Sequence, residues 1–319
     1  MVVKNSIFYC TLSLAGALCL ALLSTQTFAQ SRKPSAKAAP QTNAKAVTIR
    51  TEPNAIVWID EVRRGTTDAS GKLTLTKISA GRHNLRVRAS GFKEVNVPLL
   101  PAKRGDVPVR LTRTTDEAEL AYQQAEEARE KARDDEARKD AVELYRRAIQ
   151  LRPEFAAAHL GLARALMDQN NYKAALAEVT AARDARTVYP EASAVEGRIL
   201  RELAFEEKAI ESFRRSIREA RGFQPEAHTG LARVLEEQGQ NDEAVSEYRT
   251  AIAQLSDSEP VLYQLLGALY EKQEKYKEAV AAYEKYLQLA PEGTYASALR
   301  SILDQLRKQA AGDIPLPNP

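Results

Sequence analysis

The chain has 319 residues, of which 44% are hydrophobic and 28% charged. This composition is ordinary for a soluble globular protein, and the length suits about two domains. Both cysteines, Cys10 and Cys19, lie near the N-terminus. If that segment is removed, the mature chain has no thiol, which excludes disulfides, thiolate metal sites and a cysteine nucleophile.

The formal net charge of +3 hides an uneven distribution of charge along the chain. Residues 46–113 carry 13 basic and six acidic side chains, whereas residues 114–319 carry 28 basic and 37 acidic ones. A basic first half therefore precedes an acidic second half.

The N-terminus predicts a secretory signal peptide over residues 1–29. Lys4 precedes an apolar run that continues to Leu23, and residues 27–29 offer the small side chains that a signal peptidase accepts. Gln30 is therefore the expected first residue of the mature chain. An uncleaved membrane anchor is the alternative, because a run of this length could just span a bilayer. Export is predicted, with no integral membrane span once the signal peptide is cleaved.

Two segments lack an apolar period. Residues 30–45 are polar, rich in Ala and Pro, and basic, which predicts a disordered linker. Their charge would attract anionic lipid or glycan, although basic linkers are more often only solvated. Residues 312–319 begin with a helix-stopping glycine and contain three prolines, which predicts an extended Pro-rich tail.

Residues 46–113 show the alternation of apolar and polar side chains that is typical of half-buried strands. Val47 and Ile49 alternate in this way, as do Leu85 and Val87, and glycine-containing turns separate successive runs. Short strands at this spacing predict a small antiparallel β-sandwich. Trp58, the only tryptophan, is expected to belong to its core rather than to form a ligand platform.

The same segment resembles the PEGA domain family, a small β-sandwich module found mainly in bacterial envelope and surface proteins. The resemblance rests on Glu52-Pro53-Asn54-Ala55, Gly65-Thr66-Thr67, Ala80-Gly81-Arg82-His83 and Gly91-Phe92. Asn54 and Glu61 stand where the family usually has glycine. Asn tolerates a positive φ well, so the first departure should cost little. The resemblance implies a periplasmic or cell-envelope location.

The rest of the chain is built on a repeat of 34 to 35 residues. A small residue begins the apolar stripe of each second helix, and a bulky apolar residue follows four positions later. These repeat-packing positions are Ala141, Ala175, Ala209, Ala244 and Ala279, followed by Tyr145, Val179, Phe213, Tyr248 and Tyr283. Gly197 and Gly267 are small residues on first helices, where they allow two helices to approach closely.

At this period the pattern resembles the tetratricopeptide repeat (TPR) family, whose helix pairs stack into an α-helical solenoid. Residues 116–293 are predicted to form about five repeats. Residues 294–311 are predicted to form a capping helix, because the last hairpin must be covered. The expected fold is therefore multidomain, with a small antiparallel β-sandwich followed by a TPR solenoid.

The sequence contains no constellation that predicts catalysis. We found no nucleophile elbow, no glycine-rich loop between a strand and a helix, and no HExxH motif. His83, His159 and His228 are far apart in sequence, and the last two occupy equivalent first-helix positions, so they are expected at helix interfaces rather than on a metal. No enzyme activity, cofactor, metal or nucleic-acid partner is predicted.

The resemblance to TPR proteins also predicts a binding groove. In that family the first helices line a concave groove, and the position after the small residue projects into it. Here that position holds Arg164, Arg198 and Arg233. Three positions further on, the predicted groove residues are Arg201, Glu236 and Glu271. Arginine forks suit carboxylates, so an acidic or carboxylate-bearing peptide is the expected ligand. The alternative is that the arginines only pair with neighbouring Glu196, Glu202 and Glu237.

These features together predict an exported, non-enzymatic adaptor of the bacterial cell envelope. It would hold a protein or peptide partner in the concave face of its solenoid. The alternative is an envelope protein that binds an anionic glycan or surface polymer through the basic segment 46–113, with the solenoid as a spacer.

Overall fold

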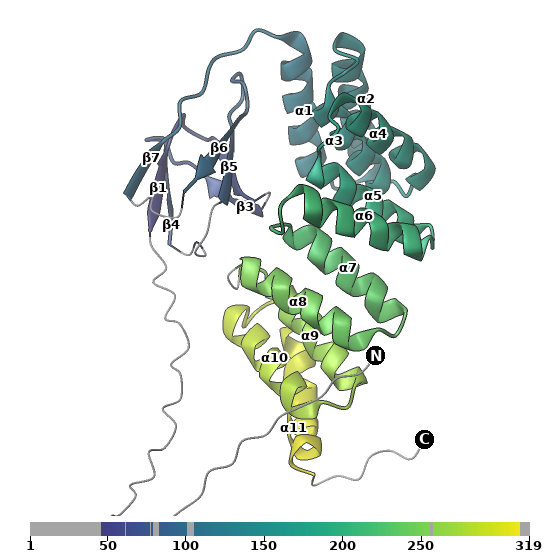
Figure 1. The fold of residues 1–319 in the computed structure, drawn as a ribbon. Coiled ribbons are helices and arrows are strands. Elements are labelled where there is room, and N and C mark those ends of the chain that lie inside the picture. The colour runs from purple at the N-terminus through teal and green to yellow at the C-terminus, as the bar shows by residue number, and fades with distance from the viewer. Residues whose placement is uncertain are drawn as a thin grey trace, which may run out of the picture. The chain divides into compact units, whose positions relative to one another are not determined.

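The computed structural model describes residues 46–60, 62–76, 78, 83–100, 105–255 and 258–312. The expected signal peptide and linker lie outside the described residues, as does the expected tail after Gly312. The described chain contains seven strands followed by eleven helices (Figure 1). This is the order of a β region followed by a helical solenoid that the sequence predicts.

The β region consists of two sheets. One has the strand order β4 (Lys72–Leu75), β1 (Val47–Arg50), β7 (Gly105–Pro108), and the other has the order β3 (Val62–Thr66), β2 (Ile56–Ile59), β5 (His83–Arg88), β6 (Val95–Leu99). All pairs are antiparallel except β1 and β7, which are parallel, whereas the sequence predicted antiparallel pairing throughout. These are the first and last strands of the region, so the intervening chain is long enough to return in the same direction.

The alternation in the strands gives each sheet one face directed at a shared hydrophobic cluster. Val47 and Ile49 of β1 lie in this cluster, together with Val57 and Ile59 of β2. Trp58 lies between the last two in sequence and therefore points to the opposite face of its sheet. It is nevertheless only 6% exposed, so something other than the shared cluster covers it.

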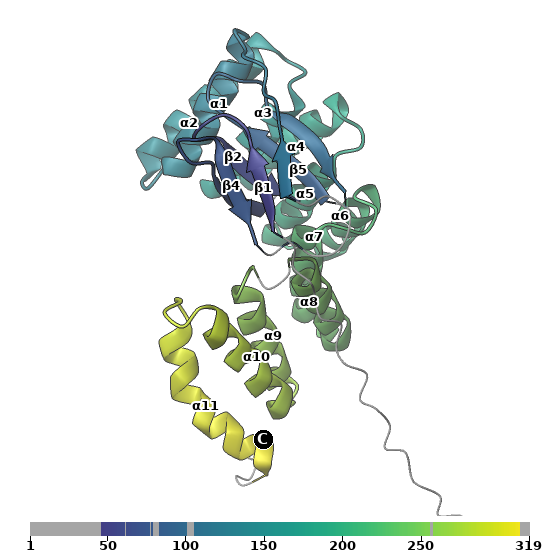
Figure 2. The ribbon, with the colours of Figure 1, turned by 90° about the vertical axis from the view of Figure 1, so that its left-hand side faces the viewer.

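The helical region is a series of antiparallel hairpins closed by a single helix. The hairpins are α1 (Glu117–Lys131) with α2 (Asp135–Leu151), α3 (Ala156–Asp168) with α4 (Tyr172–Ala185), α5 (Pro190–Glu202) with α6 (Glu206–Glu219), α7 (Pro225–Glu237) with α8 (Asn241–Leu255), and α9 (Val261–Lys272) with α10 (Tyr276–Leu289). The last helix, α11 (Ala296–Ala311), packs against α10 (Figure 2). Leu299, Leu303 and Leu306 of α11 join the hydrophobic cluster of the last hairpins.

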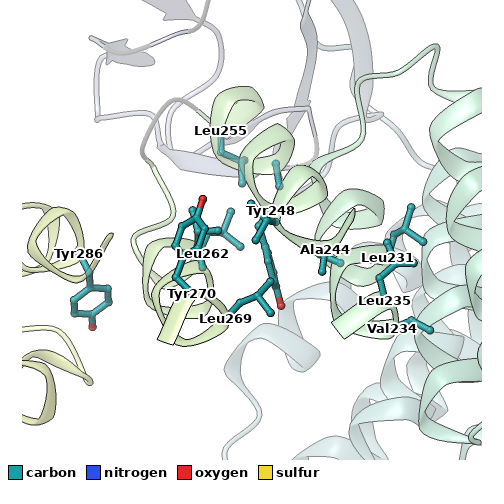
Figure 3. Close-up of a cluster of buried hydrophobic side chains, with 14 of the residues drawn as sticks. Leu231, Val234, Leu235, Ala244, Tyr248, Leu255, Leu262, Leu269, Tyr270 and Tyr286 are labelled. Carbon is teal, nitrogen blue, oxygen red and sulfur yellow. The ribbon is translucent and has the colours of Figure 1, made fainter. Parts of the chain in front are cut away.

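In two of the hairpins a glycine of the first helix packs closely against a ring of the second helix. A Cβ added at Gly197 would lie 2.7 Å from the ring of Phe213, and one added at Gly267 would lie 2.5 Å from the ring of Tyr283. The second-helix residues Ala141, Ala175, Ala209, Ala244 and Ala279 are at most 1% exposed. Figure 3 shows one part of this core, where Tyr248 and Ala244 pack with Leu231 and Leu235.

Candidate functional site

The first helices of the five hairpins present one series of equivalent positions. Counting back and forward from Arg164 by the repeat period gives Glu130 on α1, Arg198 on α5, Arg233 on α7 and Ala268 on α9. We call this series the first-helix face. Glu130 is not among the predicted groove residues, because Arg129 stands where the repeat expects a small residue and hides the register of the first copy. Subtracting one period from Arg164 would have found it.

On α1, the first-helix face contacts the β region. The Gln123 side-chain amide donates to the Phe92 carbonyl at 2.6 Å, and its oxygen accepts from the Gly91 amide at 3.0 Å. Glu130 accepts from Arg63 of β3 at 3.1 Å. The first copy of the face therefore binds the chain's own β region rather than a separate partner.

A buried ion pair lies at the centre of this contact. Arg88 of β5 donates to Glu126 at 2.7 Å and approaches Glu130 at 3.3 Å, and its side chain is only 5% exposed. Glu126 also accepts from the Tyr145 hydroxyl at 2.5 Å. Burial by itself would raise the pKa of Glu126, but the attraction of Arg88 and the hydrogen bonds from Tyr145 and Arg88 outweigh it and lower the pKa to about 2.

Two arginines of β5 lie over Trp58. The guanidinium carbons of Arg86 and Arg88 lie 4.1 Å and 4.9 Å from the centre of its ring, in cation–π geometry. Glu94 lies 3.5 Å from Arg86. Burial raises the pKa of Glu94, and the attraction of the two arginines opposes this only in part.

This contact changes the interpretation of the basic charge in residues 46–113. Arg63, Arg86 and Arg88 are three of the cations on which binding of an anionic polymer would depend, and all three lie against carboxylates of this chain. The basic excess of the β region is thus matched in part by the acidic first helix. The hypothesis of polymer binding loses support for that reason.

Further along the first-helix face there is a pocket of about 540 Å³, which we call the groove pocket. Arg198 and Arg201 of α5 and Arg233 of α7 line it, together with Asp60 from the turn after β2 and Arg63 of β3. Its apolar lining includes Val62, Val261 and Leu262. Val62 also packs against the hydrophobic cluster of the last hairpins. The pocket therefore combines an apolar floor with a charged rim.

The structure brings three of the four predicted groove arginines together. Arg198 pairs with Glu226 at 3.1 Å and Arg201 pairs with Glu202, whereas Glu196 pairs with Arg215 instead. Arg164 does not line the groove pocket and lies near the Glu126 carboxylate, whose pKa it helps to lower. Arg201 therefore pairs with Glu202, as the alternative interpretation of the groove arginines expected. Arg198 pairs instead with Glu226 of α7, which that interpretation did not name.

Arg233 differs from the other two arginines of the groove pocket. It is exposed, it hydrogen-bonds the Tyr248 hydroxyl, and no carboxylate of the described residues lies within ion-pair distance of it. The predicted acidic groove residues are held by tyrosines, since Glu236 accepts from Tyr248 at 3.3 Å and Glu271 accepts from Tyr283 at 2.9 Å.

Two of the three histidines are helix-interface residues in the structure. His159 contacts Glu178 at 2.7 Å and the Pro153 carbonyl at 2.8 Å. Two repeats later, His228 makes the equivalent contacts with Glu247 and the Gly222 carbonyl. His83 contacts Asp60 at 2.6 Å. The described part of the chain contains no cluster of His, Cys, Asp and Glu arranged to hold a metal ion. Among the helices described here, none is both long and apolar enough to cross a membrane.

Comparisons with known proteins support the repeat. Residues 132–199 and residues 223–292 each match a family model described as tetratricopeptide repeat. No curated protein sequence matches the chain.

Solved structures with a similar fold are remote in sequence. A structure of pilF from Pseudomonas aeruginosa is 17% identical and has a TM-score of 0.52, with 61% of this chain and 87% of that chain covered. YrrB, described as a TPR protein with an unusual peptide-binding site, is 19% identical at a TM-score of 0.43, covering 59% and 94%. MamA is 19% identical at 0.44, covering 64% and 100%. At these identities the likeness to pilF shows the fold alone.

Proposed function

We propose, from the tetratricopeptide repeats that this chain carries, that it is a non-enzymatic scaffold that holds a protein partner along its first-helix face. A TPR solenoid supplies a rigid surface for protein–protein interaction, and this chain adds a pocket on that surface. The observation that carries the proposal is Arg233, an exposed guanidinium without an ion pair among the described residues, beside an apolar floor.

The chemistry of the groove pocket indicates the kind of segment that fits it. A carboxylate of the partner would receive the Arg233 guanidinium fork, which is the geometry in which arginine binds carboxylates best. An apolar side chain next to that carboxylate would cover Val261, which is one of the exposed large hydrophobic residues. We therefore propose an acidic peptide segment with an adjacent apolar residue as the ligand.

The partner would use the later repeats rather than the whole face. The first copy is already filled by the β region through Gln123, Glu126 and Glu130. The β2–β3 hairpin then forms one wall of the groove pocket. A bound segment would accordingly lie against α5, α7 and α9.

The test is affinity capture of cell-envelope proteins on the chain from Gln30 onward. That chain includes the whole compact unit from Thr42 to Pro319. The Arg233→Glu variant is expected to lose the captured partner, because it places a carboxylate where the partner's own must bind. Arg146→Glu is the matched control, since Arg146 is an exposed arginine of α2 outside the groove pocket.

A partner that binds the unmodified chain and the Arg146→Glu control, but not Arg233→Glu, supports the proposal if all three chains are equally helical by circular dichroism. Equal capture by all three chains would overturn it. The captured partner can then be cut into short peptides, of which an acidic one should bind and its Asp→Asn or Glu→Gln counterpart should not.

We also propose export to the cell envelope, supported by the apolar run up to Leu23 and the resemblance of residues 46–113 to PEGA domains. Amino-terminal sequencing of the chain from a periplasmic extract should begin at Gln30. A chain that begins at Met1 and stays in the membrane fraction would instead support the uncleaved anchor.

A further inference from the structure

A second pocket continues the groove pocket beyond the start of α7. Its volume is about 610 Å³, and Asp60 and Gln224 line both pockets. The rest of its lining comes from β5, β6, the start of α5 and the loops that precede α5 and α7. We call it the loop pocket. The two pockets therefore meet between Asp60, in the turn after β2, and the start of α7.

Gln224, at this junction, is a buried polar residue without a partner. It is only 4% exposed, and its side-chain amide makes no hydrogen bond to a described residue. A buried amide without a partner is unfavourable in the free chain. Its amide atoms are not among the unpartnered atoms that are closed to solvent, so a ligand that occupies the two pockets can reach them.

The equivalent positions of the two preceding copies show that packing does not require an amide here. They hold Phe155 and Tyr189, whose rings lie against the guanidinium groups of Arg152 and Arg186. The fourth copy has Gln224 in place of a ring. A side-chain amide carries a donor and an acceptor side by side, which complement the carbonyl and the N–H of a peptide backbone.

The loop pocket also offers two guanidinium groups. Arg186 and Arg221 are exposed, and no carboxylate of the described residues lies within ion-pair distance of either. Asp60 and Glu191 line the same pocket, so a free anion would meet repulsion there as well as attraction. A peptide suits this mixture better, because its backbone is neutral and it can place an acidic side chain beside the arginines alone.

Two asparagines of the β region favour an extended peptide. Asn84 of β5 lies opposite Pro98 of β6, and Asn96 is two positions before Pro98, so the two asparagines are diagonal neighbours on one face of the sheet. Such neighbours are about 7–8 Å apart, close to the roughly 6.6 Å between alternate residues of an extended chain. Both side chains are exposed, and neither makes a hydrogen bond to a described residue.

We propose that the acidic peptide segment in the groove pocket continues past Gln224 into the loop pocket, and that the Gln224 amide pairs with its backbone. This inference rests on the proposed function, because it starts from the segment whose carboxylate binds Arg233. The lining of the groove pocket follows α7 from Gln224 to Arg233, which at 1.5 Å per residue is about 14 Å. About four extended residues match this length, and a second acidic side chain beyond them would meet Arg186 or Arg221.

The test compares two amidated peptides that carry a fluorophore at the N-terminus. The heptapeptide Glu-Leu-Ala-Ala-Ala-Leu-Glu has the same order of side chains in both directions, and its glutamates are about 20 Å apart when extended, which exceeds the length along α7. The tripeptide Glu-Leu-Ala is too short to span from Arg233 to Gln224. Each peptide is titrated with the chain from Gln30 onward, with fluorescence anisotropy as the readout. We expect the heptapeptide to bind about tenfold or more tightly, because only it reaches Gln224 and the arginines of the loop pocket.

Gln224→Met keeps the length of the side chain and removes its amide. It should weaken binding of the heptapeptide about fivefold or more and leave binding of the tripeptide unchanged. The urea midpoint of the free chain should stay equal or rise, because the change breaks no hydrogen bond. The double change Arg186→Gln and Arg221→Gln should also weaken only the heptapeptide. The matched controls are Gln150→Met and Arg214→Gln, which alter exposed residues outside both pockets.

Four results would overturn the inference. These are absence of saturable heptapeptide binding at millimolar concentration, equal affinity of the two peptides, and a heptapeptide affinity that Gln224→Met leaves unchanged. The fourth is a lower urea midpoint of Gln224→Met, which would show that the amide is already bonded in the free chain. The proposed function fails by a different result, namely equal capture of the partner by Arg233→Glu and the unmodified chain.

Discussion

Replacing Arg88 by Met tests whether the buried ion pair fastens the β region to the first helix. The change removes the cation that Glu126 pairs with and leaves its carboxylate buried, with the Tyr145 hydroxyl donating to it and Arg164 nearby. Glu130 loses its 3.3 Å contact in the same step. An uncompensated buried charge is strongly destabilising, so we expect a large loss of unfolding free energy.

Two routes give the magnitude. Removing one partner of a buried ion pair costs about 3–5 kcal/mol in other proteins. For this protein, the pKa of Glu126 is lowered from 4.5 to about 2. That difference corresponds to about 3 kcal/mol of stabilisation of the ionised carboxylate in the folded chain. This net figure, in which burial opposes Arg88, Tyr145 and Arg164, is of the same order, so Arg88→Met should lower the unfolding free energy by about 3–5 kcal/mol at neutral pH.

Urea unfolding of the chain from Gln30 is a suitable assay, because Trp58 is the only tryptophan and lies against Arg86 and Arg88. Its fluorescence reports on the contact itself, while circular dichroism reports on the helices. The matched control is Arg50→Met. Arg50 pairs with Asp106 at 2.7 Å, but both side chains are about half exposed, so its loss should cost less than about 1 kcal/mol.

A double-mutant cycle with Glu126→Gln measures the pair itself. The double variant should lose less stability than the two single variants added together, since it leaves no unpaired charge. If Arg88→Met costs no more than Arg50→Met, the pair does not fasten the β region and the reasoning is refuted.

Three further predictions concern acid stability, a second buried carboxylate and the packing of a hairpin. The pKa of Glu126 in the folded chain, about 2, lies below its ordinary value, so the stability that its ionised form contributes is complete above about pH 4.5 and is lost as the pH falls toward 2. The urea midpoint should therefore drop less between neutral and acid pH in Glu126→Gln than in the unmodified chain. Glu94 has a raised pKa, so its ionised form is disfavoured in the folded chain and stability falls as the pH rises above its ordinary range. Glu94→Gln should therefore equal or exceed the unmodified chain in urea at pH 7, and a clear loss would contradict this. Gly197→Ala brings a Cβ to 2.7 Å from the Phe213 ring and should cost about 1–3 kcal/mol in thermal or urea unfolding; an unchanged midpoint would show that the ring can move aside.

The comparison of sequence with structure is clearest in the repeat. Ala141 and its four equivalents lie on the second helix of each hairpin. Gly197 and Gly267 pack against the rings of Phe213 and Tyr283, where only a residue without a Cβ fits closely. These contacts lie within one hairpin and recur in each copy, so a single chain carries the same information several times. The order of a β region before a helical solenoid follows from the change of apolar period in the same way.

The candidate site was predictable only in part. The repeat period places Arg198, Arg201 and Arg233 on one face, and the structure brings them to one pocket. The repeat period does not indicate that Arg164 lies near Glu126, or that the β2–β3 hairpin provides a wall of the pocket. These contacts are made once, between segments with different periods, and leave no repeated pattern in the sequence.

The sequence by itself determined the elements of this protein, their order and the register of its repeats, because local periodicity and residue size decide those. Only the tertiary structure decided which charges meet. Arg88 and Glu126 are 38 residues apart, on a strand and a helix, and nothing in either segment identifies the other as its partner. An ion pair depends on a few ångströms of separation and on exclusion of water, and both arise when the β region packs against α1. That contact fills the first copy of the face and leaves the later copies for a partner.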